Sequence, residues 1–117
     1  MRDDPARLRI SLDRILKETA AGRDAFRNDP KMQVWVLYHL QVVGEACRGL
    51  SESFRARFSN PVWTSAIGLR NILVHNYFEI EHDLVWQVVE GDLPSFRKAV
   101  ESALKQISQT SEPIKPT

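Results

Sequence analysis

Residues 70–77, Arg-Asn-Ile-Leu-Val-His-Asn-Tyr, place an arginine, a histidine and a tyrosine at fixed offsets inside an otherwise apolar stretch. Polar side chains cost free energy to bury unless they are paired, so a folding sequence has little reason to place three of them there. Histidine titrates near neutral pH and can carry a proton, whereas arginine keeps its charge and donates paired hydrogen bonds to phosphate oxygens. The pattern indicates chemistry at a phosphate ester, in which Arg70 holds the phosphate and His75 moves a proton.

Two neighbouring residues could serve the same chemistry. Asn71 could orient the phosphate or the histidine, and Tyr77 could donate to a phosphate or stack on a base. One motif supplies a single histidine, although cleavage of a phosphodiester needs both a base and an acid. A symmetric dimer would supply both. The sequence has no cluster of acidic residues at metal-ligand spacing, so we expect no metal requirement and no cofactor.

A helix over roughly residues 61–76 is predicted to carry the motif. Asn60 followed by Pro61 is a typical helix start, and Asn76 is a suitable terminator. The apolar residues of this segment form a broad face that would pack against the rest of the molecule. They are Val62, Trp63, Ala66, Ile67, Leu69, Leu73 and Val74.

The same helix carries a narrow polar stripe. Its members are Thr64, Gly68, Asn71 and His75. At about 100° per residue these four share one face, whereas Arg70 lies about 140° around the helix from His75. A glycine in mid-helix costs about 1 kcal/mol relative to alanine, so we expect a backbone or a ligand to approach closely at Gly68. Two copies of the helix meeting across Gly68 would pair their motifs.

The rest of the chain also has the apolar spacing of helices, without strand alternation, repeats or a linker. We predict a single all-α bundle. Its other helices are expected over residues 8–19 (ending by Gly22), 29–50, 51–58 and from 82 or 83 to 107, with Leu84 buried. Pro94 should break or kink the last helix, because it lacks the N–H group and clashes with the preceding turn. Residues 109–117 are polar, contain two prolines and are predicted to be a disordered tail.

Composition narrows the class of protein. The formal charge is only +1, so any nucleic-acid contact would come from a local group of arginines and not from a generally basic surface. The single cysteine, Cys47, excludes an intrachain disulfide and a multi-cysteine metal site. The sequence has no membrane-spanning apolar run and no signal peptide, so we expect a cytoplasmic protein.

Several residues also have a plain structural interpretation. Arg70 and His75 could cap and salt-bridge within the fold, and His39 and His82 could be a packed and a surface histidine. Glu45 lies among apolar neighbours, where a buried carboxylate would need a cation, and Arg70 is a candidate partner. The three arginines at positions 48, 55 and 57 could be a solvated face or could help to hold a nucleic acid. Trp35, Trp63 and Trp86 fit core anchors better than a cofactor pocket.

The spacing Arg70-x4-His75-x-Tyr77 resembles the motif of HEPN-domain ribonucleases, in particular the HepT-like toxins of bacterial toxin–antitoxin pairs. Other segments resemble the same family in the expected order. These are residues 43–46 (Val-Gly-Glu-Ala), 61–71, 85–86 and 92–94. The likeness covers roughly residues 5–107, and the arginine, asparagine, histidine and tyrosine positions all match.

The resemblance implies a HEPN-type bundle of four to five helices over residues 1–108 that dimerises around a shared cleft. It implies metal-independent endonucleolytic cleavage of RNA by Arg70 and His75 from both protomers, with Asn71, Tyr77 and Glu45 in supporting positions. It also implies a cognate antitoxin of the minimal nucleotidyltransferase family. In some such pairs the antitoxin transfers AMP to the motif tyrosine, which would be Tyr77 here.

A second hypothesis belongs to another class of protein. The same cleft could serve a non-catalytic nucleotide-binding or scaffold subunit that docks a nucleotidyltransferase. An intact arginine–histidine pair favours the enzyme, because a scaffold would not require both residues.

Overall fold

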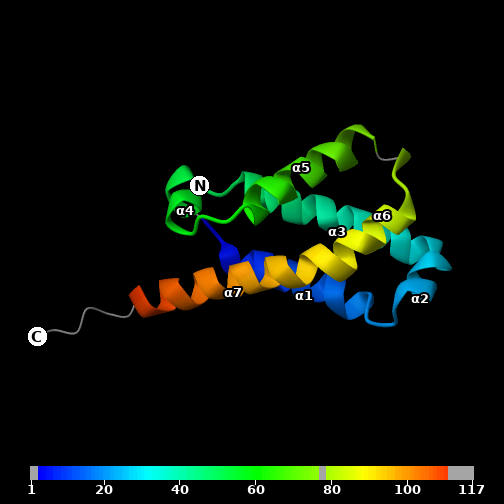
Figure 1. The fold of residues 1–117 in the computed structure, drawn as a ribbon, viewed down its shortest axis with the longest axis horizontal. Coiled ribbons are helices and arrows are strands. Elements are labelled where there is room, and N and C mark those ends of the chain that lie inside the picture. Colours follow the sequence, from blue (N-terminus) through cyan, green and yellow to red (C-terminus); the bar gives the residue numbers. More distant parts are fainter. Residues whose placement is uncertain (1–2, 77–78, 111–117) are drawn as a thin grey trace, which may run out of the picture.

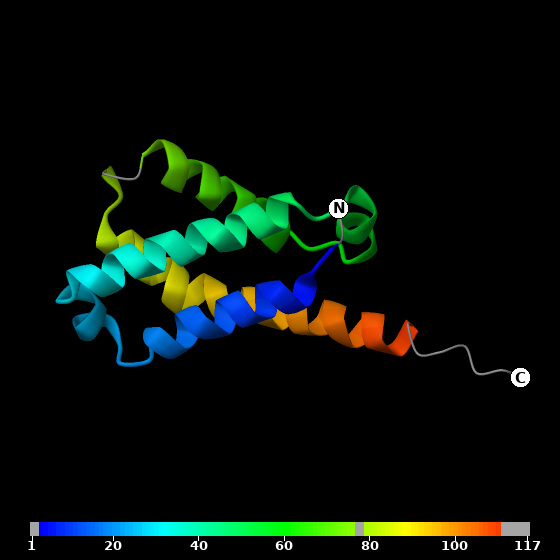
Figure 2. The same ribbon diagram turned by 180° about the vertical axis from the view of Figure 1, so that it is seen from behind.

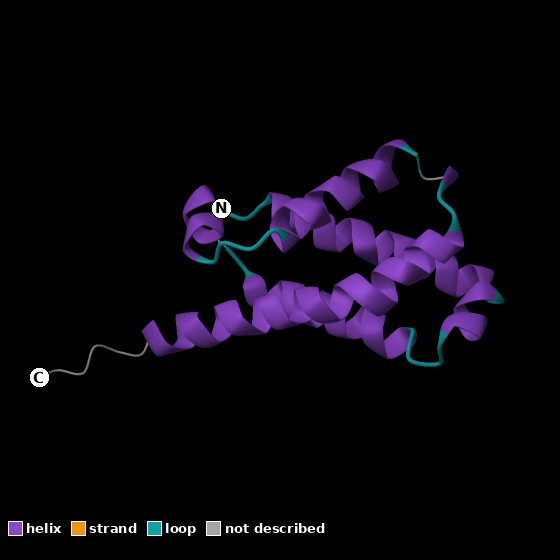
Figure 3. Ribbon diagram, in the orientation of Figure 1, coloured by secondary structure: helices purple, strands orange, loops and turns teal. Residues whose placement is uncertain are grey.

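The computed structural model describes residues 3–76 and 79–110, apart from the side chains of residues 109 and 110. Over these residues the chain is helical and contains no strand, as the apolar spacing predicted (Figure 3). The elements are α1 (Pro5–Glu18), α2 (Arg23–Arg27), α3 (Pro30–Arg48), α4 (Glu52–Arg57), α5 (Val62–His75), α6 (His82–Gln87), the π-helical turn η2 (Val88–Asp92) and α7 (Leu93–Thr110). No helix of this described part is long and apolar enough to cross a bilayer.

The long helices form a bundle with α3 at its centre. Helices α1 and α7 run side by side along one edge, and α5 lies on the other side of α3 (Figure 1). The view from behind shows the same order, with the short helices α2 and α4 closing opposite ends of the bundle (Figure 2). Helix α5 packs mainly against α3, so one of its faces remains open to solvent.

The apolar core lies between α1, α3 and the long run from α6 to α7. Its largest fully buried side chains are Phe26, Leu8, Leu12, Ile15, Leu40, Leu73, Val36, Val100 and Cys47. Cys47 is therefore a small packed hydrophobe. Trp63 and Trp86 are buried core anchors, as predicted, whereas Trp35 is only partly buried.

Side-chain caps define where the helices begin. One carboxylate oxygen of Asp29 accepts hydrogen bonds from the backbone N–H groups of Lys31 and Met32, both at 3.1 Å. The hydroxyl oxygen of Ser51 accepts from the N–H of Phe54 at 3.1 Å. These bonds satisfy donors that the first turn of a helix leaves without partners. The predicted starts of α3 and α4 are thus confirmed.

The last helix is irregular where residues 91–94 were predicted to break or kink it. The backbone passes from α6 into α7 without a loop (Figure 1). The wide turn η2 stands immediately before Pro94 and takes up the irregularity, because a π-helical turn changes the hydrogen-bond ladder that proline interrupts. The sequence thus located the irregular segment correctly.

Helix α1 ends at Glu18, before Gly22 as predicted, but Gly22, with a φ of 100°, also precedes the short helix α2, which the sequence analysis did not predict. Helix α2 is fixed by Gln33, whose side-chain amide donates to two carbonyl groups of α2. Leu84 and Val74, expected to be buried, are exposed.

Candidate active site on helix α5

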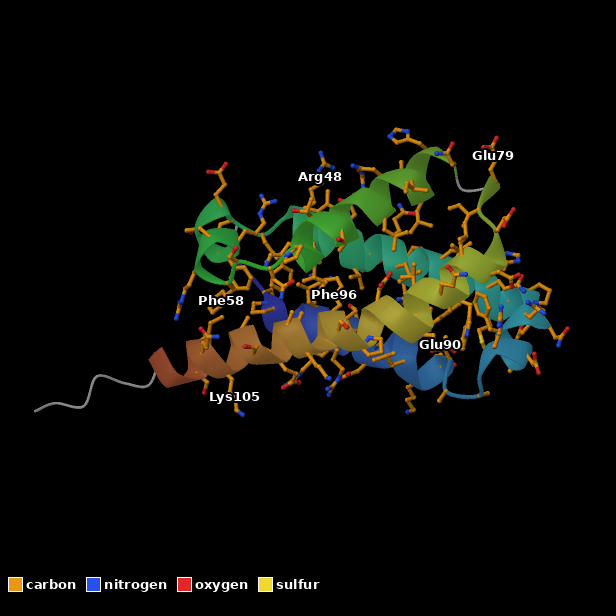
Figure 4. All side chains as sticks on the ribbon, in the orientation of Figure 1. Arg48, Phe58, Glu79, Glu90, Phe96 and Lys105 are labelled. Atoms are coloured by element: carbon orange, nitrogen blue, oxygen red, sulfur yellow. The ribbon has the colours of Figure 1, made fainter. Side chains whose placement is uncertain are left out.

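The first half of α5 is fixed in the core by Trp63. Its indole Nε1–H donates to the carbonyl oxygen of Phe58 at 2.8 Å. The ring meets the edges of Phe54 and Phe96, with centroids 5.8 and 5.7 Å away. Figure 4 shows Phe96 pointing from α7 into the bundle. Asn60 fits its predicted role as the start signal, because its side-chain oxygen accepts from the first N–H of α5 at 3.0 Å.

The predicted polar stripe of α5 faces solvent. Its members Thr64, Gly68, Asn71 and His75 are all exposed. Helix α5 ends at His75, and the N–H of Asn76 donates to the carbonyl oxygen of Ile72 at 2.8 Å, which closes the last turn. A histidine at the open end of a helix can meet a substrate without any rearrangement of the core.

Arg70 lies on a different side of α5, turned toward α3. Its side chain is 19% exposed, its Nε forms an ion pair with Oε1 of Glu45, and its Nη1 donates to Oδ1 of Asn71 at 3.0 Å. The prediction that Arg70 pairs with Glu45 is therefore confirmed. Glu45 is 44% exposed, so the expectation of a buried carboxylate was wrong. The side chain of Asn71 links the guanidinium to the exposed stripe.

A close approach between helices occurs at Gly44 on α3, whereas the approach of a second copy or a ligand at Gly68 stays a prediction. A Cβ on Gly44 would lie 2.2 Å from Cβ of Arg70 and 2.9 Å from the carbonyl oxygen of Ala66. A Cβ on Gly68 would meet nothing within 4 Å in the described part of this chain. Sequence reasoning missed the role of Gly44. The available signal was a glycine next to Glu45, in the interior of a helix.

The other arginines divide between two places. Arg48 at the end of α3 lies 3.9 Å from Oε1 of Glu45, so Glu45 stands between two guanidinium groups. In Figure 4, Arg48 lies on the side of the bundle that carries α5. Arg55 and Arg57 belong to α4, where the Arg57 guanidinium stacks 4.7 Å above the ring of Phe58. Arg48 and Arg70 thus share the carboxylate of Glu45, whereas Arg55 and Arg57 lie on another helix.

The remaining histidines have structural surroundings. The ring of His39 lies 4.0 Å from that of Trp35, and burial together with the charge of Arg14 lowers the pKa of His39 below 6.5. His82 is exposed at the start of α6, with its ring 6.3 Å from Phe26. Both match the structural interpretation. Across the described residues, no group of three His, Cys, Asp or Glu side chains could hold a metal ion.

The site therefore has one arginine braced against α3 and one exposed histidine. His75 is five positions after Arg70, which is about 7.5 Å along a helix axis. No hydrogen bond joins them in the described part of the chain, and they lie on different sides of α5. Tyr77, the third member of the motif, lies outside the described residues. A cation held in place and a proton carrier are the side chains that chemistry at a phosphate ester requires.

Comparison with known families gives the class of protein. Residues 8–103 match the family described as "Ribonuclease HepT-like". A protein of Methanocaldococcus jannaschii named "Putative RNase MJ1380" is 41% identical over 76 residues, which cover 65% of this chain and 70% of that protein. "Putative RNase MJ0127" from the same organism is 34% identical over 89 residues, covering 76% and 74% of the two chains.

A further relative comes from Thermococcus cleftensis. "Probable ribonuclease HepT" is 29% identical over 80 residues, which are 68% of this chain and 73% of that protein. No solved structure matches the chain significantly. The family match spans most of the sequence, including α5 and the segment around Glu45. The chain belongs to the HepT-like ribonuclease family and is a ribonuclease by class.

Proposed function

We propose that this protein is a metal-independent endoribonuclease toxin, active as a homodimer and neutralised by a nucleotidyltransferase antitoxin. The observation that carries the proposal is that α5 presents an exposed His75 and also carries Arg70, which is held against α3 by Glu45. Arginine in a fixed orientation can bind a phosphate through paired donors, and histidine can transfer protons near neutral pH. RNA supplies its own nucleophile in the 2′-hydroxyl group.

In the proposed reaction the 2′-oxygen attacks the adjacent phosphorus and the bond to the 5′-oxygen breaks. One histidine accepts the proton of the 2′-hydroxyl, and a second histidine donates a proton to the leaving 5′-oxygen. Arg70 stabilises the negative charge that develops on the phosphorane, while Asn71 orients the guanidinium. The products are a 2′,3′-cyclic phosphate and a 5′-hydroxyl end, without any metal ion.

The second histidine would come from a second copy of the chain. Helix α3 exposes Val34 (56%) and Tyr38 (60%). At helical spacing these two residues lie on the same face of α3 as Gln41 and Glu45. A shallow apolar groove borders this face. Exposed apolar patches of this kind mark interfaces. Because Glu45 contacts Arg70, a dimer seam on this face would border the site.

The dimer is tested with Tyr38→Glu, which places a charge in the proposed seam. We expect a monomer in light scattering and at least a tenfold loss of RNA cleavage, because each site loses its second histidine. Lys105→Glu is the matched control, since Lys105 points away from the bundle on α7 (Figure 4). A Tyr38→Glu protein that remains dimeric, or a monomer that retains full activity, would contradict this part of the proposal.

The antitoxin would act on Tyr77. In this reaction the phenolic oxygen attacks the α-phosphorus of ATP, pyrophosphate leaves, and AMP becomes bonded to the tyrosine. A bulky anion at the mouth of a phosphate-binding cleft would exclude the RNA phosphate by occupancy and by like-charge repulsion. The family resemblance supports this step. It is tested by incubation with the cognate nucleotidyltransferase and ATP, followed by mass spectrometry of the wild type and Tyr77→Phe.

The ribonuclease itself is tested with purified protein, mixed cellular RNA and EDTA. We expect fragments with 2′,3′-cyclic phosphate ends from the wild type and none from His75→Ala. Cleavage by His75→Ala at the wild-type rate would reject His75 as the proton carrier. Cleavage that stops in EDTA would reject metal independence. No cleavage by protein whose Tyr77 is shown to be unmodified would favour the scaffold hypothesis.

A further inference from the structure

We propose that Gly44 and Glu45 of α3 are positioning residues that set the placement of Arg70 before RNA binds. Gly44 lets the arginine stem lie directly on the α3 backbone, and Glu45 holds the Nε edge of the guanidinium so that Nη2 remains for the substrate phosphate. This inference rests on the proposed ribonuclease function. It assigns a role to two residues that lie outside the Arg-x4-His-x-Tyr motif.

The first support is the contact at Gly44. No side chain other than hydrogen fits there, because a Cβ would overlap Cβ of Arg70 and crowd the carbonyl oxygen of Ala66. The obstructing atoms are the root of the arginine side chain and a backbone oxygen, neither of which can swing aside. Gly44 therefore fixes how close α5 comes to α3 at the residue that binds phosphate.

The second support is the asymmetric environment of the guanidinium. Nε of Arg70 is fully buried and has no hydrogen-bond partner among the described residues, but it forms an ion pair with the carboxylate of Glu45. Nη1 donates to Asn71, whereas Nη2 has no hydrogen-bond partner among the described residues. A buried charged edge without its counterion is strongly unfavourable, so Glu45 keeps the arginine against α3. The remaining donors are left for a phosphate.

The third support is the sign of the charge on Glu45. A carboxylate beside a phosphate site weakens binding of a polyanion, so affinity alone gives no reason for its presence. Correct orientation does give a reason, because a misplacement of about 1 Å can reduce the rate about 100-fold. Glu45 should therefore favour the chemical step while opposing RNA binding. These opposite effects on the chemical step and on RNA binding distinguish a positioning role for Glu45 from a general electrostatic or structural role.

The decisive variant is Glu45→Gln, which keeps the size of the side chain and removes its charge. We expect kcat to fall about 10- to 100-fold, KM to stay unchanged or decrease, and the melting temperature to remain within a few degrees. Glu101→Gln is the matched control. Glu101 also lies between two arginines, Arg9 and Arg97, with similar exposure, but it lies on α7 away from α5. Its cleavage kinetics should remain at the wild-type values.

Gly44→Ala provides a second variant with the same expected loss of kcat. Its stability is compared with that of Gly68→Ala, where the added methyl group meets nothing within 4 Å of the same chain. We expect Gly44→Ala to lower the melting temperature and Gly68→Ala to leave it unchanged or raise it. If both alanine variants melt alike, the close packing at Gly44 does not constrain the helices.

The placement of Arg70 is also measured without any enzymatic assay. The Nε–H resonance of Arg70, assigned by its loss in Arg70→Lys, should exchange slowly with solvent in the wild type and rapidly in Glu45→Gln. Unchanged kcat in Glu45→Gln would overturn the inference, as would a loss of activity fully explained by unfolding. A wild type that cleaves no RNA would be a failure of the proposed function. The exchange measurement would still show whether Glu45 holds the guanidinium.

Discussion

Trp63 at the start of α5 is 2% exposed and is enclosed by aromatic rings from α4 and α7, whereas Ile72, near the end of the same helix, is 53% exposed. The first half of α5 contacts several elements of the bundle. The second half contacts mainly α3, and Leu73 is its one fully buried side chain in the described structure. One helix thus has an anchored half and an open half.

The difference between the halves indicates how the site is built. The anchored half fixes the direction of the helix, because large buried aromatic side chains contribute most to core stability. The open half presents Asn71 and His75 to solvent without exposing the core. Arg70 stands at the boundary, where the contact with α3 still determines the position of its side chain. Stability and activity should therefore respond to changes at different residues.

The largest effect should come from His75→Ala in the open half. We expect RNA cleavage to fall by about 10²- to 10⁴-fold, because a proton carrier is lost, while the free energy of unfolding changes by less than about 0.5 kcal/mol. Initial cleavage rates and urea unfolding measure the two quantities. His82→Ala is the control histidine, with activity and stability both near wild type. A large loss of stability in His75→Ala would mean that the open half also supports the core.

Trp63→Ala should show the opposite pattern in the anchored half. We expect the free energy of unfolding to fall by about 3–5 kcal/mol, because the change leaves a cavity among Phe54, Phe58 and Phe96. Trp63→Phe keeps most of the ring packing and loses the hydrogen bond to Phe58, so its cost should be about 1 kcal/mol. Urea unfolding followed by circular dichroism gives both values. Equal stability of Trp63→Ala and wild type would remove the distinction between the halves.

Two adjacent residues test the open half in finer detail. Leu73→Ala should cost about 2–5 kcal/mol, since Leu73 is fully buried against α3. Ile72→Ala should change the stability by about 0.5 kcal/mol or less, because Ile72 is exposed. Thermal unfolding at low protein concentration compares the pair while limiting any contribution from self-association. Similar costs for both would show that the open half packs differently from the described arrangement.

The smallest effect concerns Cys47, which is buried on α3 at the anchored end of the bundle. Burial raises the pKa of its thiol from 9.0 to about 12. The unfolded chain releases this proton at lower pH than the folded chain, so Cys47 lowers stability as the pH rises from about 9 to 12. Near pH 8 a thiol reagent should label the native protein slowly and the urea-unfolded protein at once. Fast native labelling would contradict the tight packing of this end.

Much of this architecture was predictable from local signals. Asp29 and Ser51 marked helix starts because their side chains satisfy donors within the same few residues. The exposed face of α5 followed from the helical repeat alone. The partnership of Arg70 with Glu45 was also predictable, since a carboxylate between apolar neighbours needs a cation. The burial of Leu84 and Val74 was predicted wrongly, because the apolar periodicity of a helix does not show how much of its surface the neighbouring helices cover.

The sequence by itself determined the all-α class, the positions of the main helices and the arginine–histidine motif, because these depend on local backbone chemistry and spacing. The tertiary structure decided the rest. It placed a close contact between α3 and α5 at Gly44, gave the irregular segment before Pro94 the form of a π-helical turn, and left Val34 and Tyr38 exposed on α3. The physical reason is that the distance between two helices depends on how their side chains pack together. The spacing of residue types along the sequence does not specify that packing.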